Sequence, residues 1–68
     1  MTTLRVTTQD DRSPLVVHKT GLNVGEQVAL AGAAHRCGLI AGGHVGFVAV
    51  HPQRVVDLFV ELGWEPDL

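Results

Sequence analysis

The fold of this chain is decided by residues 44–64, which read HVGFVAVHPQRVVDLFVELGW. Residues 44–50 are apolar on both faces of an extended chain, so they predict a strand that is covered on both sides or contacts another chain. Pro52 then fits the first position of a helix, where its missing N–H costs no hydrogen bond. Gly63 fits the left-handed position at which helices end. This stretch therefore predicts a strand followed directly by a helix.

The helix within this stretch has an apolar side at helical spacing. Val55, Phe59 and Leu62 recur at i, i+4 and i+7. Trp64 follows the terminal glycine and is expected to fold back on the last turn, as the hydrophobic residue of a Schellman motif does. We expect Trp64 and Phe59 to pack at the centre of the core, and residues 65–68 to form a frayed polar tail.

Two further strands are predicted upstream. Residues 3–8 alternate between apolar and polar and are rich in strand-forming side chains. Residues 15–18, which read LVVH, predict a second strand. The polar segment 9–14 between them is rich in turn-forming residues, so the two strands are expected to close a hairpin.

A first helix is expected between residues 23 and 37. Asn23 and Glu26 have the spacing of a capping box, and Gly38 stands where a left-handed residue would end the helix. The small residues Ala29, Gly32 and Ala33 would let a strand or another helix approach closely. The chain as a whole thus predicts an α+β fold in the order β-β-α-β-α. We expect a three-stranded sheet and two helices within a single domain, residues 1–68.

Composition limits how this chain is stabilised. A domain of 68 residues buries only about 60% of the surface of its unfolded chain. The single cysteine, Cys37, excludes an intrachain disulfide. Because 46% of the residues are hydrophobic, self-association is expected to supply the stability that so small a core lacks.

The charge of the chain and its apolar segments indicate which classes of partner and which cellular compartment to expect. The net charge is −2, and the five basic residues are scattered, which disfavours nucleic-acid binding. No signal peptide or membrane-spanning run is recognised, so no membrane partner is expected and a cytoplasmic location is predicted. The chain has no tyrosine and is rich in alanine, glycine and valine, a bias typical of GC-rich bacterial or phage genes.

The histidines and the cysteine are the candidates for chemistry. His35 and Cys37 are two residues apart on a helix and point in nearly opposite directions. His44 and His51 are seven apart on a strand and face opposite sides. Cys37 also lies near a helix C-terminus, where the dipole disfavours a thiolate. We therefore expect no metal site, no cofactor and no catalytic residue at these positions.

The adjacent acids Asp10 and Asp11 lie in a polar turn. A catalytic carboxylate pair needs a cleft around it, and nothing in the surrounding sequence predicts one. We therefore expect both side chains to be solvated.

Residues 44–50 together with residues 59–66 resemble the opening strand and helix of the glyoxalase/bleomycin-resistance family. In that family, a strand bearing a metal-binding histidine leads to a helix that ends in a leucine-glycine-aromatic turn. The ending is also similar to the last helix of many N-acetyltransferases. The resemblance covers residues 44–66, and no activity is carried over from it, since the following strands and the acetyl-CoA loop are absent from this sequence.

Taken together, the sequence predicts a small non-enzymatic protein-binding or regulatory protein that acts through self-association. The third strand is expected at the sheet edge, where Val45, Phe47, Val48 and Val50 would form the interface of a homo-oligomer. Two alternatives stay open. One is a histidine-based ligand- or metal-binding module, and the other is a minimal enzyme subunit whose site is shared between chains.

Overall fold

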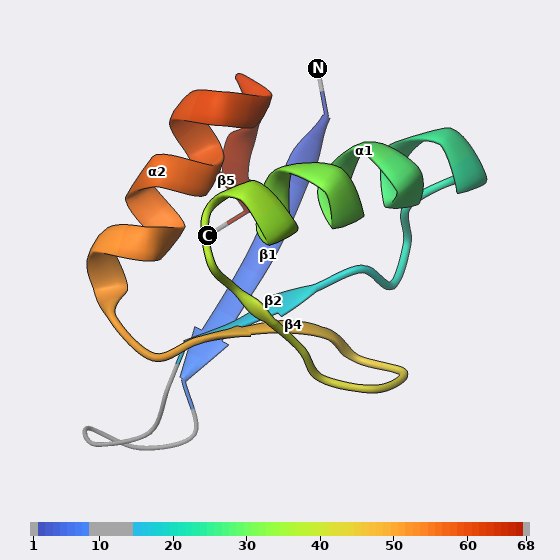
Figure 1. The fold of residues 1–68 in the computed structure, drawn as a ribbon. Helices are drawn as coiled ribbons and strands as arrows, with labels where there is room; N and C mark the ends of the chain where they lie inside the picture. Colours follow the sequence, from blue (N-terminus) through green and yellow to red (C-terminus); the bar gives the residue numbers. More distant parts are fainter. Residues whose placement is uncertain (1, 9–14, 68) are drawn as a thin grey trace.

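Helices and strands follow one another in the order ββαββαβ in the computed structural model, which describes residues 2–8 and 15–67 (Figure 1). The helices are α1 (Val24–Arg36) and α2 (Pro52–Leu62). The strands of the described part are β1 (Thr3–Thr8), β2 (Leu15–His18), β3 (Ile40–Ala41), β4 (Gly46–Ala49) and β5 (Glu65–Asp67).

The strands form one mixed sheet in the order β3-β4-β2-β1-β5, with both helices on one face of it (Figure 1). All neighbouring pairs are antiparallel except β1 and β5, which run parallel. The α+β class and the two helices are therefore confirmed. The predicted count of three strands is wrong, since the described residues form five.

Strand β5 is one of the two strands that were not predicted. It lies in a segment that was expected to be a frayed tail. Thr3 lies opposite Glu65, and the Glu65 N–H donates a hydrogen bond of 3.1 Å to the Thr2 carbonyl oxygen. The segment Glu65-Pro66-Asp67 has low strand propensity by itself. It becomes a strand because α2 ends beside β1 and leaves the backbone of β1 available for pairing.

Strand β3 is the other strand that was not predicted, and its pairing with β4 changes the position of β4 in the sheet. After a hairpin through Gly42 and Gly43, the chain folds back so that Ile40 lies opposite Val48. The Gly42 N–H donates to the Gly46 carbonyl oxygen at 2.8 Å. Strand β4 therefore lies between β3 and β2, and the expectation that it forms a sheet edge is wrong.

Local signals set the helix boundaries as predicted. Asn23 Oδ1 accepts a hydrogen bond of 2.8 Å from the Glu26 N–H, and Glu26 Oε1 accepts one of 3.0 Å from the Asn23 N–H. The bond from the Asn23 backbone, followed by one from the Thr2 hydroxyl, lowers the pKa of Glu26 below its ordinary value. Gly38 and Gly63 are left-handed, with φ of +81° and +70°.

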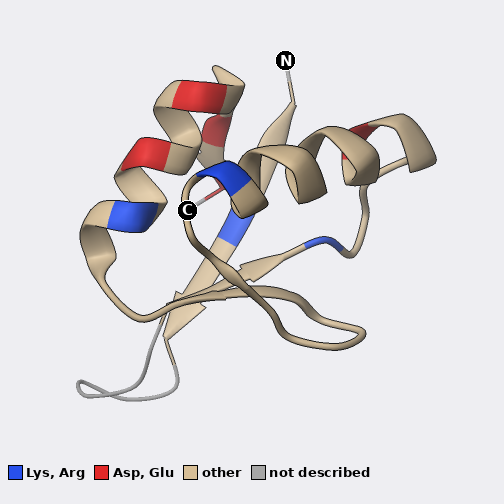
Figure 2. Cartoon of the chain, in the orientation of Figure 1, with Lys and Arg blue, Asp and Glu red and all other residues tan. Residues whose placement is uncertain are grey.

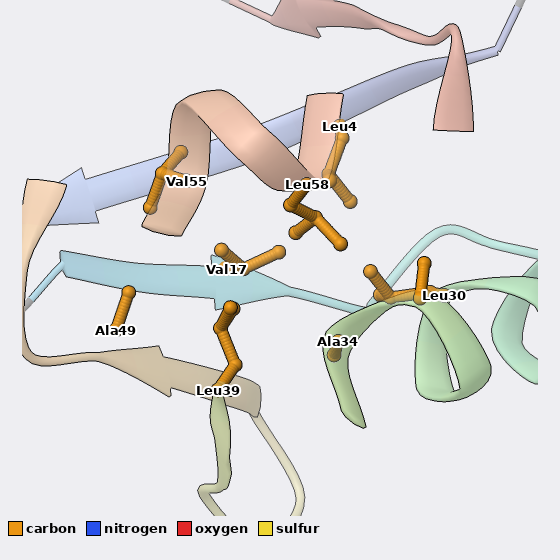
Figure 3. Close-up of a cluster of buried hydrophobic side chains, with 9 residues drawn as sticks. Leu4, Val17, Leu30, Ala34, Leu39, Ala49, Val55 and Leu58 are labelled. Atoms are coloured by element: carbon orange, nitrogen blue, oxygen red, sulfur yellow. The ribbon is translucent and has the colours of Figure 1, made fainter. Parts of the chain in front are cut away.

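The core lies between the helices and the sheet (Figure 3). Its fully buried large side chains are Leu4, Val17, Leu30 and Leu58. Trp64 and Phe59 are half-buried and pack against this cluster from outside, so the prediction that they form its centre is wrong. Leu58 takes the central place because the face of α2 that meets the sheet is centred on that residue.

Neither α1 nor α2 is both long and apolar enough to cross a membrane.

Candidate functional site

The outer side of α1 carries no formal charge. Between Glu26 and Arg36 the helix has no Lys, Arg, Asp or Glu, and Figure 2 shows its coloured residues only near its two ends. Residues 37–53, which include β3 and β4, also have none. Among the described residues, α2 carries the most charged side chains, and the exposed side of α1 between Glu26 and Arg36 carries none.

A shallow groove runs along this uncharged side. It has a volume of about 240 Å³, and we call it the α1 groove; it is lined by Lys19, Val24, Gln27, Val28, Ala31 and Phe47. Val24 is 79% exposed and Val28 is 67% exposed. Large apolar side chains that gather on a surface in this way are typical of sites that contact another molecule.

The groove follows from how α1 is seated on the sheet. Leu30, Ala33 and Ala34 point into the core. Val28 and Ala31 lie on the far side of the helix, because the helical period turns them away from that face. The opposite wall is Phe47 of β4, which points to the helix side of the sheet but stays half-buried.

The base of the groove is fixed by backbone pairing. The Lys19 N–H donates a hydrogen bond of 2.9 Å to the Val45 carbonyl oxygen, just beyond the paired parts of β2 and β4. This bond extends the β2–β4 ladder and holds Lys19 beside the loop that precedes β4. Lys19 is the only charged residue that lines the α1 groove.

The four residues predicted as an oligomer interface do not form one surface. Phe47 lines the α1 groove, and Val45 precedes it on an exposed loop. Val48 points to the opposite, helix-free face of the sheet, where it pairs with both Ile40 and Val16. Val50 is exposed after the end of β4.

The valines of α1 were not identified from the sequence. Val24, Val28 and Ala31 are spaced i, i+4 and i+7, a signal that is visible in the sequence. Such spacing more often marks a buried side than an exposed one. Here the neighbouring Leu30, Ala33 and Ala34 supply the buried side instead.

A second depression lies on the helix-free face of the sheet. It has a volume of about 260 Å³ and is lined by Thr3, Arg5, His18, Thr20, Gly21, Leu22 and Asp67. His18 Nε2 and Thr7 Oγ1 are hydrogen-bonded at 2.6 Å, which fixes the imidazole ring across β1 and β2. Arg5 and Asp67 lie opposite each other on β1 and β5. We call this the His18 depression.

The remaining histidines and the cysteine are not brought together. Across residues 2–8 and 15–67, no three His, Cys, Asp or Glu side chains gather as metal ligands would. Burial raises the pKa of the Cys37 thiol, and the carboxylates of Glu61 and Asp57 raise it further. Cys37 is half-buried and packs against the core cluster. Asp10 and Asp11 lie outside the described residues.

No protein-family model, no curated protein and no solved structure matches the chain.

Proposed function

We propose that this chain is a non-enzymatic protein-binding module that self-associates through the α1 groove. The observation that carries the proposal is the exposed, uncharged side of α1 beside Phe47. Val24 and Val28 are exposed to solvent on a helix whose opposite side contributes three residues to the core. A partner that covers them would remove apolar surface that the monomer cannot bury.

The magnitude of this burial supports binding over a role as ordinary surface. Covering a valine fully is worth about 1.5–3 kcal/mol. Two such side chains, with Phe47 on the opposite wall, supply part of the free energy of a micromolar affinity, which is about 8 kcal/mol after the cost of association is subtracted. Lys19 is the only charged residue among the described residues that line the groove, so a partner gains mainly from apolar contact here.

The test is a comparison of two valine-to-lysine variants in solution. Val28→Lys places a charge in the groove, whereas Val60→Lys does the same on α2, where Val60 is 78% exposed. Sedimentation equilibrium at tens of micromolar should show an associated wild type, a monomeric Val28→Lys variant and a Val60→Lys variant like the wild type.

Two results would contradict the proposal. A monomeric wild type would reject self-association. An associated Val28→Lys variant alongside a monomeric Ile40→Lys variant would move the interface to the helix-free face of the sheet, where Ile40 is 59% exposed.

A second candidate function rests on the His18 depression. Arg5, Thr3 and Thr20 supply donors suited to a small carboxylate or phosphate, and His18 lines the same depression. Titration with acetate and with inorganic phosphate should then shift the amide resonances of β1 and β2 in a saturable way. The shifts should disappear in Arg5→Ala, and their absence in the wild type would reject this candidate.

A further inference from the structure

The exposed side of α1 carries a seam with coiled-coil spacing. Val24, Val28, Ala31 and His35 are separated by four, three and four residues, which is the alternation of a and d positions in a heptad. All four side chains are exposed. A seam with this spacing fits the side of another helix better than it fits a strand or an irregular segment.

We propose that the partner is a second copy of this chain, and that the two α1 helices pack antiparallel across a two-fold axis between residues 29 and 30. This inference rests on the proposed self-association and specifies its geometry. In this register, Val28 lies beside the partner's Ala31, and Val24 lies beside the partner's His35. The wall formed by Phe47 then contacts the partner helix from the side.

Size complementarity favours this arrangement. Along the seam, the large side chain of Val28 lies against the small side chain of the partner's Ala31. Each valine therefore fills the space that an alanine leaves. The helix interior has no formal charge that packing of the two helices would bury.

Electrostatics also favours an antiparallel pair. The N-terminal end of a helix is partly positive and the C-terminal end partly negative. Antiparallel packing places each positive end beside the partner's negative end. Parallel packing would align like ends, and it would also stack Val28 on the partner's Val28 while leaving a gap between the two alanines. His35, the polar member of the seam, lies at its outer end, where its ring stays in contact with water.

Cysteine cross-linking tests the register directly. In a Cys37→Ala background, one chain carries Val24→Cys and a second carries His35→Cys; both side chains are exposed, so the fold is retained. The chains are mixed and oxidised mildly. Random pairing of equal amounts would give as much mixed disulfide as both homodisulfides together. In the antiparallel pair the mixed disulfide should exceed the two homodisulfides combined by at least about tenfold, because thiols within a dimer react at about millimolar effective concentration.

The homodisulfides provide the opposing prediction. Two Val24→Cys residues in an antiparallel pair are separated by about 16 Å along the helix axis. A disulfide requires Cα atoms closer than about 7 Å. Val24→Cys alone should therefore form little disulfide. A Val60→Cys chain on α2 serves as the matched control for cross-linking by random collision.

The possible results separate this inference from the function on which it rests. Loss of association in Val28→Lys together with an abundant Val24→Cys homodisulfide would keep the groove as the interface and overturn the antiparallel register. A monomeric wild type would overturn both. A dominant mixed disulfide, with no more cross-linking of Val60→Cys than of denatured chains, supports the antiparallel pair.

Discussion

Gly46→Ala is expected to lower the free energy of unfolding by about 2–6 kcal/mol, from strained backbone and steric overlap that each cost about 1–3 kcal/mol. Gly46 has φ of +149°, which side chains rarely adopt. A Cβ there would overlap the carbonyl oxygen of Val17 and come within 2.9 Å of the Lys19 nitrogen. Both are backbone atoms of the segment paired with β4, so relief requires the two segments to separate.

The matched control for this substitution is Gly43→Ala. Gly43 also has a left-handed φ of +71°, but nothing lies within 4 Å of a Cβ built there. It should cost only the strain of the left-handed conformation, about 1–2 kcal/mol. Urea denaturation followed by circular dichroism measures both variants. Equal losses at the two positions would show that the close approach of β2 and β4 at Gly46 is relieved without cost.

Leu58→Ala is expected to destabilise the protein by about 2–5 kcal/mol, as removal of a fully buried leucine does. Leu58 has no exposed surface and lies among Leu4, Val17 and Leu30 (Figure 3). A chain of this length has a total stability of about 3–10 kcal/mol. The loss should therefore be a large fraction of the total stability and should lower the melting temperature and the urea midpoint markedly.

Val60→Ala is the control on the same helix. Val60 is exposed, so its truncation should change stability by no more than about 0.5 kcal/mol. Thermal and urea melts of the two variants give the comparison. A Leu58→Ala variant as stable as Val60→Ala would mean that α2 does not rest on the sheet through Leu58.

The residues that stabilise the fold are distinct from those proposed to bind a partner. Leu30 and Leu58 are fully buried, whereas Val24 and Val28 are mostly exposed. Substitutions in the α1 groove should therefore change association with little change in monomer stability. That separation makes the interface testable in so small a domain.

An ion pair joins the two helices. Arg36 of α1 and Glu61 of α2 form an ion pair of 2.7 Å in which both side chains are about half exposed. Pairs of this kind contribute about 0–1 kcal/mol. The relative position of the helices is therefore set mainly by their apolar contacts with the sheet, and the groove is positioned by the same core that stabilises the fold.

The sequence by itself determined the helices and their ends. Asn23 with Glu26, Pro52, Gly38 and Gly63 act through atoms a few residues away, so their effect can be read without knowing the rest of the fold. The alternation in residues 3–8 likewise placed Leu4 in the core. The exposed valines of α1 were readable in the same way, but their spacing alone cannot say which side of a helix stays uncovered.

Tertiary structure alone decided the strand order, the strands β3 and β5, and the surface that remains open. Strands pair through backbone N–H and C=O groups rather than through side chains. The side chains of Glu65-Pro66-Asp67 therefore do not predict the pairing of this segment with β1. The interior position of β4 depends on β3 folding back along it. The α1 groove exists because Leu30, Ala33 and Ala34 face the core, which leaves Val24 and Val28 exposed among the described residues.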